Sequence, residues 1–383
     1  MTNKKARLIA FYLPQFHPTD LNDDWWGKGY TEWRNVTQAK PLFKGHYQPH
    51  EPADLGYYDL RLPEIREQQA QMAKEAGIEG FCYWHYWMGN DTVLLKRPFE
   101  EVLNSGKPDY PFCLGWANHD WTNKTWTKYS AFSKEKSYIK VHYSVEDYKK
   151  HFQYVLPAFK DKRYMTVDGK PIFYIWDTTA FPNVSEFINL WQDLARENGL
   201  NGIYFVGLIR TIGHFNLKGK NKVPSLDEYK DTISHTFNEG FDAINTFNFT
   251  RAEFLSRGKW RVLLDKILYH YFKIGNTRIL DYRKMLPYLF VDEERNENVW
   301  PTVMPNWDRS PRAGKDCQIY THTTPKMFRE ALSKAIEIVK HKEPEHRIII
   351  IKSWNEWGEG NHLEPDLKYG HQYLEVIKEL MDE

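Results

Sequence analysis

Two glutamates near the carboxyl terminus, Glu356 and Glu359, form the clearest chemical pattern in the sequence. They follow the most apolar run of the chain, Ile348–Ile351, and lie in the run SWNEWGEG at 353–360. A turn just past that run would direct both carboxylates into one cavity. Two carboxylates in a desolvated cleft separate in pKa, so that one acts as a base and the other holds a proton. Cleavage of a glycosidic bond needs this division, because one group protonates the leaving oxygen while the other acts at the sugar.

Acidic pairs are more often solvated loop residues, and this is the alternative for Glu356 and Glu359. The flanking residues argue against it, since the pair is bracketed by Trp354 and Trp357. Gly358 and Gly360 would supply a tight turn and a close backbone approach. We therefore take both glutamates as catalytic candidates.

Aromatic, amide and charged residues also follow other apolar runs, and aromatic residues make up 16% of the chain. Aromatic rings cover the apolar faces of pyranoses while polar groups bind the hydroxyls, so this set is typical of a sugar site. The alternative is that the rings only cap a core. The candidate substrate-binding residues are Tyr12, His17, Trp84, His85, Trp116, Asn118, Trp121, Asp177, Trp307, Arg309, Asn355 and Trp357.

Some of these side chains have a second interpretation. His17 and His85 could bind a metal, but neither stands in an H-x-x-x-H or H-x-H spacing, so hydrogen bonding to hydroxyls is favoured. Arg309 and Arg312 could clamp a phosphate, uronate or sulfate, or could equally pair with local acids. The sequence predicts no metal site and no cofactor, and no G-x-G-x-x-G motif follows a strand.

The elements that must position these residues are read from hydrophobicity. Eight short apolar runs recur, and each is continuous, as expected for strands buried on both faces. Segments of helical period separate them, which implies parallel crossovers and a (β/α)8 barrel whose site lies at the carboxyl ends of the strands. We expect one catalytic domain over residues 1–383. The runs are 7–14, 79–87, 111–118, 171–177, 202–209, 242–249, 300–308 and 347–354.

Helices are expected between the runs, and one begins with Pro63 and closes on Gly77, which are typical start and stop residues. A sixth helix is expected within 251–271, and 273–297 is expected to be a loop. The other expected helices are 145–159, 183–198, 324–341 and 371–383.

Composition excludes several classes of protein. The formal net charge of the 383 residues is +1, which provides no general field for nucleic acid. No segment approaches the roughly 18 apolar residues of a membrane span. The three cysteines form no C-x-x-C pair, so a disulfide framework and a thiolate zinc site are not expected. The first residues lack a signal-peptide core, which favours a cytoplasmic location.

The sequence resembles glycoside hydrolase family 99, the endo-α-mannosidases, and the related WbsX-type proteins of bacterial surface-polysaccharide clusters. The resemblance spans nearly the whole chain. One difference is WANHDW at 116–121, where the family usually has WANENW, and this exchange bears on sugar selectivity. The matching segments are FYLPQFHP at 11–18, WWGKGYTEW at 25–33, HYQP at 46–49, GFCYWHYW at 80–87, WAN at 116–118, RAGK at 312–315, WNEWGEG at 354–360 and LEP at 363–365.

The resemblance implies a barrel and metal-free retaining chemistry. Glu356 would deprotonate the 2-hydroxyl of the sugar, which attacks the anomeric carbon to give a 1,2-anhydro sugar. Glu359 would be the general acid and then the base. This route requires a 2-hydroxyl trans to the leaving group, as in α-mannosides or α-rhamnosides.

The expected activity is therefore cleavage of a glycosidic bond in a bacterial oligosaccharide or polysaccharide. Glycosyl transfer in O-antigen or capsular polysaccharide synthesis is the alternative, favoured by the usual name of the family and by the missing secretion signal. A sugar-binding protein without catalysis is a third possibility, disfavoured because both acidic positions are present.

Overall fold

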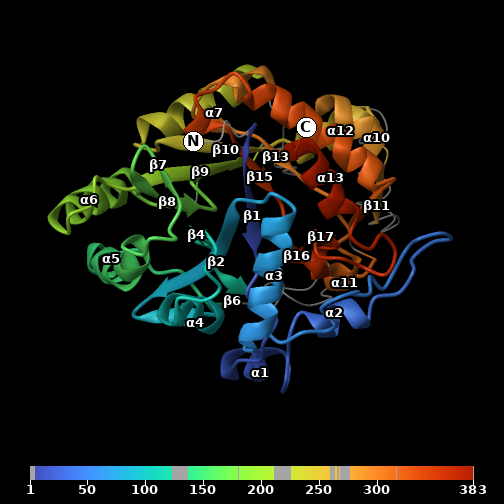
Figure 1. The fold of residues 1–383 in the computed structure, drawn as a ribbon, viewed down its shortest axis with the longest axis horizontal. Coiled ribbons are helices and arrows are strands. Elements are labelled where there is room, and N and C mark those ends of the chain that lie inside the picture. The colour runs from blue at the N-terminus through green and yellow to red at the C-terminus, as the bar shows by residue number, and fades with distance from the viewer. Residues whose placement is uncertain are drawn as a thin grey trace.

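The computed structural model describes residues 5–122, 137–179, 181–210, 226–258, 277–315 and 317–382, together with Leu264 and Ile267. Its centre is a parallel sheet that curves round into a barrel, and helices lie outside that sheet (Figure 1). The predicted (β/α)8 barrel is confirmed. None of the described helices combines the length and the apolar character needed to cross a bilayer.

Each predicted run contains part of the barrel. The first strand pairs in parallel with both the second and the last, which brings the two ends of the sheet together. The seventh strand is interrupted at Pro301, because proline has no N–H to donate, and its two halves pair with opposite neighbours. In chain order the strands are β1 (Arg7–Tyr12), β2 (Gly80–Gly89), β4 (Phe112–Trp116), β8 (Lys170–Ile175), β9 (Tyr204–Arg210), β10 (Ala243–Phe247), β12 (Val299–Trp300) with β13 (Thr302–Val303), and β15 (Ile348–Ile351).

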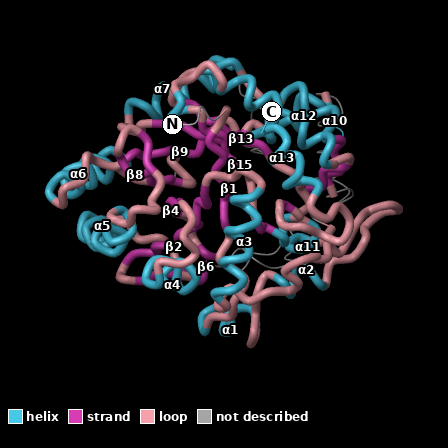
Figure 2. Tube along the Cα trace, in the orientation of Figure 1, coloured by secondary structure: helices cyan, strands magenta, loops and turns pink. Residues whose placement is uncertain are grey.

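The outer helices match most of the predicted segments (Figure 2). The bounds of α5 agree with the prediction because the Ser144 side chain caps the helix, accepting a hydrogen bond from the backbone N–H of Asp147 at 3.1 Å. Within the range 251–271 the structure describes most of α8 together with Gly258, Leu264 and Ile267, and the other residues lie outside the described part. The longer helices outside the barrel are α3 (Pro63–Glu75), α4 (Arg97–Ser105), α5 (Val145–Phe159), α6 (Val184–Glu197), α7 (Leu226–Asn238), α8 (Phe249–Arg257), α12 (Pro325–Val339) and α13 (Gln372–Asp382).

The prediction of a loop over 273–297 is wrong for the described part, 277–297. This part contains β11 (Arg278–Asp281) and α10 (Tyr282–Met285), followed by two short 3-10 turns. β11 pairs in parallel with β14 (Gln318–Thr321) outside the barrel. A four-residue strand whose only partner is far along the chain has no local pattern that predicts it.

Side chains of the barrel strands alternate between the interior and the surrounding helices. Inside, the ring of Phe11 lies 4.4 Å from that of Trp84 and 5.2 Å from that of Tyr174, between centroids. The next residue, Tyr12, points outward, and its hydroxyl donates to Oε1 of Gln69 in α3 at 2.6 Å. The neighbouring residue on a strand therefore lies in a different environment.

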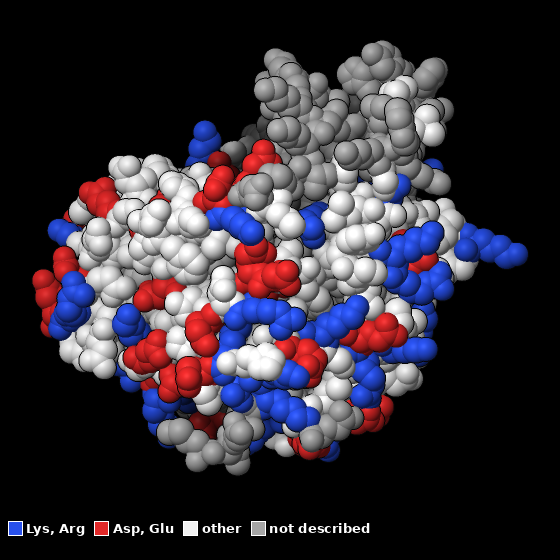
Figure 3. Space-filling model, turned by 90° about the horizontal axis from the view of Figure 1, so that it is seen from above, with Lys and Arg blue, Asp and Glu red and all other residues white. Residues whose placement is uncertain are grey.

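Two short helices, α1 (Asp20–Trp26) and α2 (Trp33–Thr37), lie at the end of the barrel toward which β1 runs (Figure 1). The helical turn α11 (Ser310–Ala313) contacts both α2 and the segment after β15. Long connections thus gather at the carboxyl ends of the strands. On the face of the molecule in Figure 3, acidic and basic side chains are interspersed.

The Tyr12 hydroxyl provides a stability test. Tyr12→Phe leaves the buried Oε1 of Gln69 without its donor, so the free energy of unfolding should fall by about 1–3 kcal/mol in urea denaturation. Tyr57→Phe is the control, since that side chain is 50% exposed. Equal unfolding midpoints for Tyr12→Phe and the unaltered protein would contradict the outward placement of Tyr12.

Candidate active site

The chain turns back on itself directly after β15 and forms a small hairpin that carries both motif glutamates. β16 (Asn355–Glu356) pairs antiparallel with β17 (Asn361–His362), and a 3-10 turn over Trp357–Glu359 joins them. Gly360 ends the turn with φ +57°, a conformation that favours glycine. As the three-residue spacing predicted, Glu356 and Glu359 both line one cavity.

That cavity has a volume of about 680 Å³ and lies at the carboxyl ends of the barrel strands. Rings from four different strands or their following loops form part of its wall, and apart from Ala117 the remainder is polar or charged. His119 and Asp120, at which this sequence departs from the family pattern, also line it. The wall consists of Trp84, Tyr86, Ala117, His119, Asp120, Thr122, Trp176, Phe247, Thr250, Trp307, Arg309, Arg312, Gln318, Lys352, Glu356 and Glu359.

Lys352 bridges the two glutamates. Its Nζ lies 3.2 Å from Oε2 of Glu356 and 3.4 Å from Oε2 of Glu359, and the residue is only 5% exposed. The ammonium also lies 5.0 Å from the ring centroid of Trp307 and 5.5 Å from that of Trp176, within cation–π range. One buried cation therefore holds both carboxylates on the same side of the cavity.

Arg312 provides a second connection. Its Nη1 lies 3.0 Å from Oε1 of Glu359, and its Nε donates to Oε1 of the buried Glu32 at 3.0 Å. Arg309 lies 3.2 Å from the same Glu359 oxygen and is 41% exposed. Of the two interpretations open for these arginines, pairing with local acids is the one that this geometry displays.

The three cations act unequally on the two glutamates. Burial alone would raise the pKa of Glu359, but Lys352, Arg312 and Arg309 outweigh burial and hold that pKa well below its usual value. Glu356 lies near two of these cations, Lys352 at 3.2 Å and Nη2 of Arg312 at 4.0 Å, and also accepts a hydrogen bond from the Ser353 hydroxyl at 3.1 Å. Glu359 is therefore ionised at neutral pH in the protein without substrate.

The hairpin is anchored to the barrel from behind. Asn355 exchanges two hydrogen bonds with the backbone of Leu13, accepting from its N–H at 2.7 Å and donating to its carbonyl at 3.0 Å. The indole N–H of Trp357 donates to Oε2 of Glu364 at 2.6 Å, and burial raises the pKa of Glu364 to about 7. Asn355 and Trp357 therefore support the turn that carries Glu356 and Glu359 and do not line the cavity.

Of the predicted site residues, Trp84, Trp307, Arg309, Glu356 and Glu359 line the cavity. The structure places the others elsewhere. His85 lies one position after Trp84 and faces α5, where its Nε2 lies 2.9 Å from Nε2 of His151. Trp116 pairs in register with His85, and its indole N–H donates to the Trp87 carbonyl. Tyr12 also points toward a helix, so strand alternation separates these residues from the cavity.

Four further candidates have local partners. Nδ1 of His17 lies 2.9 Å from the Pro14 carbonyl oxygen. Asn118 accepts from the backbone N–H of Asp177 and donates to its carbonyl, both at 2.8 Å, which joins the ends of β4 and β8. Trp121 is fully buried and packs edge-on against Tyr86, with centroids 5.4 Å apart. Trp121 therefore backs a ring that does line the cavity.

Several lining residues were not predicted. Tyr86 lies two positions after Trp84, and Trp176 lies two positions after the interior Tyr174, so period-two alternation from those anchors would have found them. Lys352 follows four buried isoleucines directly, and a lysine at the end of a fully buried strand is an available signal. Glu32 has no local signal, because its partner Arg312 is 280 residues away.

The protein is thus a (β/α)8 barrel with two buried carboxylates just past its last strand. Among proteins with this fold, the chain belongs to the family described as Glycosyltransferase WbsX, whose model matches residues 8–377.

Two similar proteins are both described as uncharacterized protein WxcX, from two strains of Xanthomonas campestris pv. campestris. Each is 31% identical over 379 residues, which cover 98% of this chain and 50% of WxcX. The chain thus spans about half the length of the curated relatives it matches.

Among solved structures, the fold is similar to that of a GH99 endo-alpha-mannosidase from Bacteroides thetaiotaomicron, with a TM-score of 0.56 and 16% identity over 98% of this chain and 96% of that one. A glycoside hydrolase-like protein gives a TM-score of 0.56 and 15% identity over 100% and 95% of the two chains. At this identity the comparison establishes the shared fold. It agrees with the resemblance read from the sequence motifs.

Adding a single methyl group at Gly358 should disturb the ion pair between Glu32 and Arg312. An added Cβ would clash with Oε1 of Glu32 and lie 2.9 Å from Nε of Arg312. Gly358→Ala should therefore lower the free energy of unfolding by about 1–3 kcal/mol in urea denaturation.

The matched control shortens the residue that the new methyl group meets. Glu32→Asp makes room, so the Gly358→Ala/Glu32→Asp variant should lose less stability than the sum of the two single losses. Strict additivity would contradict the close approach of Gly358 to Glu32.

Proposed function

We propose that this protein cleaves a glycosidic bond of a polysaccharide with retention of configuration, using Glu356 and Glu359. The observation that carries the proposal is the buried pair of carboxylates on one wall of the cavity, bridged by Lys352. A volume of about 680 Å³ is within the usual range for a small-molecule site, and Trp84, Trp176 and Trp307 supply flat apolar surfaces for sugar rings.

The proposed first step forms a 1,2-anhydro sugar, as the motif resemblance implies. The Glu356 carboxylate takes the proton of the sugar 2-hydroxyl, and O2 attacks the anomeric carbon. The bond from that carbon to the leaving oxygen breaks, and the leaving oxygen takes a proton from Glu359. The 2-hydroxyl must be trans to the leaving group, so α-mannoside-like or α-rhamnoside-like sugars are the proposed substrates.

The second step reverses the proton movements. Water attacks the anomeric carbon and gives its proton to the Glu359 carboxylate, while O2 leaves that carbon and recovers the proton from Glu356. Each glutamate ends in its starting state, and two inversions at the anomeric carbon give net retention.

The ion pairs impose a condition on this scheme. Glu359 is ionised in the protein without substrate, so it must gain a proton when the sugar binds. Arg309 is the partner most able to move away, because it is 41% exposed whereas Arg312 and Lys352 are buried. We propose that the bound sugar separates Arg309 from Glu359 and so raises the pKa of that carboxyl.

Replacing each glutamate separates the two roles. Glu359→Gln removes the proton donor, so turnover of an unactivated glycoside should fall by roughly 10²–10⁴-fold, while a glycosyl fluoride or dinitrophenyl glycoside should be partly spared in the bond-breaking step. Glu356→Gln should cripple both kinds of substrate, because the base acts on the sugar itself. Glu375→Gln, at an exposed glutamate of α13, is the control.

A 2-deoxy substrate tests the internal nucleophile in the unaltered protein. Removing the 2-hydroxyl should abolish turnover. Undiminished cleavage of the 2-deoxy glycoside, or full activity of both Gln variants on an unactivated glycoside, would overturn the proposed roles.

The pH profile of Arg309→Gln tests the role of Glu359. Loss of this cation should raise the pKa of Glu359, because Arg309 is one of the three cations that lower it. If Glu359 must be protonated, kcat/KM then persists to higher pH, because the alkaline limb of the profile moves upward. Movement of the acidic limb instead would assign Glu359 as a base in the first step. Arg61→Gln is a matched control, since Arg61 is also 41% exposed and pairs with Asp59.

Transfer is a second candidate function, favoured by the description of the family as a glycosyltransferase. The same two glutamates would serve if an acceptor hydroxyl replaced water in the second step. Incubation with α-manno- and α-rhamno-oligosaccharides, with and without nucleotide sugars, distinguishes the two. Products that form only with a nucleotide sugar would favour transfer and overturn the proposal of hydrolysis.

A further inference from the structure

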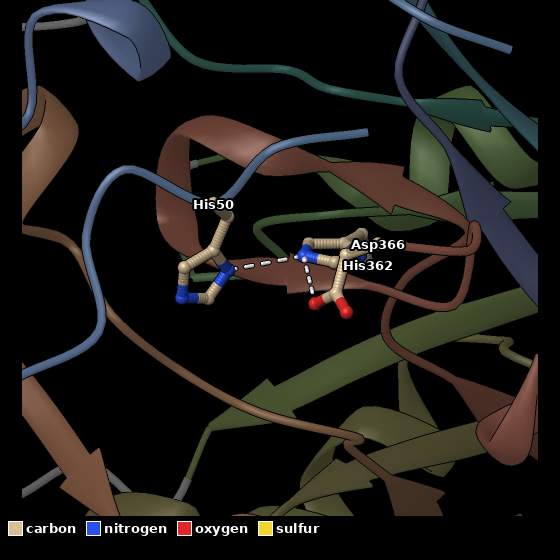
Figure 4. Close-up of side chains that lie close together, drawn as sticks. All are labelled: His50, His362 and Asp366. Atoms are coloured by element: carbon tan, nitrogen blue, oxygen red, sulfur yellow. Dashed lines mark hydrogen bonds and ion pairs between the residues drawn. The ribbon is translucent and has the colours of Figure 1, made fainter. Parts of the chain in front are cut away.

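A second cluster of titratable side chains lies beside the catalytic hairpin and outside its cavity. His50 comes from the long connection after β1, His362 from β17, and Asp366 from the segment that follows β17 (Figure 4). They are 9%, 1% and 3% exposed. Nδ1 of His50 lies 3.1 Å from Nε2 of His362, which lies 3.9 Å from Oδ2 of Asp366. One ligand atom from each residue lies within 4.8 Å of the other two.

The hydrogen bonds around the cluster orient two of its possible cation-binding atoms inward. Nδ1 of His362 lies 3.0 Å from the Glu364 carbonyl oxygen, so it must carry the proton, and Nε2 presents a lone pair to His50 and Asp366. Oδ1 of Asp366 accepts the backbone N–H groups of Lys368 and Tyr369 at 2.9 and 2.7 Å, which leaves Oδ2 directed at His362.

A lone pair and a carboxylate oxygen thus face each other in a buried space. The single proton of His50 can satisfy only one of them, whereas a cation can bind all three atoms at once. A second hydrogen bond that fixes the tautomer of a ligating histidine is the usual arrangement around bound metals.

We propose that His50, His362 and Asp366 bind a divalent transition-metal cation of the zinc class, at a site separate from the catalytic glutamates. Two imidazoles and one carboxylate suit zinc and its neighbours, whereas calcium and magnesium prefer all-oxygen sites. Sequence spacing does not predict this site, because His50 is 312 residues from His362.

The surroundings leave room for a further ligand. His50 and Asp366 line a second cavity of about 460 Å³, together with His46, Tyr47, Asp308 and other residues. Water entering this cavity can complete a four-coordinate site. His46 and Gln48 are engaged with Asp308, at 2.6 and 2.7 Å from its Oδ2, so the proposed ligand set is limited to the trio.

The position of the trio suggests a supporting role. His362 lies directly opposite Asn355 in the hairpin, and its ring stacks on Trp357 with centroids 3.6 Å apart. A cation bound there would tie the loop carrying His50 to the back of the turn that holds Glu356 and Glu359. It touches no group that would act on the sugar.

Metal content and thermal unfolding test the proposal without any substrate. The full chain, stripped with chelator and dialysed against zinc, should retain a single zinc ion per chain by elemental analysis, and zinc should raise its unfolding midpoint. Calcium and magnesium should not. His50→Gln and His362→Gln should lose the bound zinc and the zinc-dependent shift. His371→Gln, at an exposed histidine paired with Asp54, should keep both.

Asp366→Asn serves as a further variant in case the histidine variants fail to fold, because its Oδ1 can still accept the Lys368 and Tyr369 N–H groups. It should weaken zinc binding at least ~10-fold. No retained zinc in the unaltered chain, or equal retention by all variants, would overturn the proposal and would identify the cluster as a hydrogen-bonded pair of histidines beside a carboxylate. Because these readouts involve no glycoside, they are independent of the proposed function.

Discussion

The site depends on the ion pairs that the Lys352 ammonium forms with Glu356 and Glu359. Two carboxylates three residues apart repel one another in a desolvated cavity, and Nζ of Lys352 offsets this repulsion by lying 3.2 and 3.4 Å from them. Arg312 continues the network to Glu32, which is completely buried. Breaking a buried pair by removing one partner typically costs about 3–5 kcal/mol, so the hairpin and its cations form one unit.

The barrel makes this network possible by bringing distant segments together at the carboxyl ends of its strands. β15 lies between β1 and β13, and the chain turns immediately after it, so the glutamates project over the barrel end. Asn355 binds the backbone of Leu13, and Arg312 reaches Glu32 from the connection after β13. Each of these contacts joins residues about 280 or more positions apart. The site is therefore a product of the closed fold.

The barrel could be predicted because strands buried on both faces are continuously apolar, and all eight runs overlap with barrel strands. The pair β11 and β14 could not be predicted, since each strand depends on a partner remote in sequence. In the site, the turn and the glutamates followed from the spacing of charged and glycine residues. The direction in which each side chain points was harder to predict. Trp84 lines the cavity while the adjacent His85 faces α5, and the residue types at the strand ends do not distinguish these two positions.

The central claim is that Glu356 and Glu359 act on a glycosidic bond with retention. The most direct measurement is the proton NMR spectrum of the anomeric signals, recorded from the first minutes of reaction on an α-manno- or α-rhamno-oligosaccharide. The account predicts that the α-anomer appears first and later mutarotates toward the equilibrium mixture. First appearance of the β-anomer would contradict it, because a single displacement leaves no place for the 1,2-anhydro intermediate.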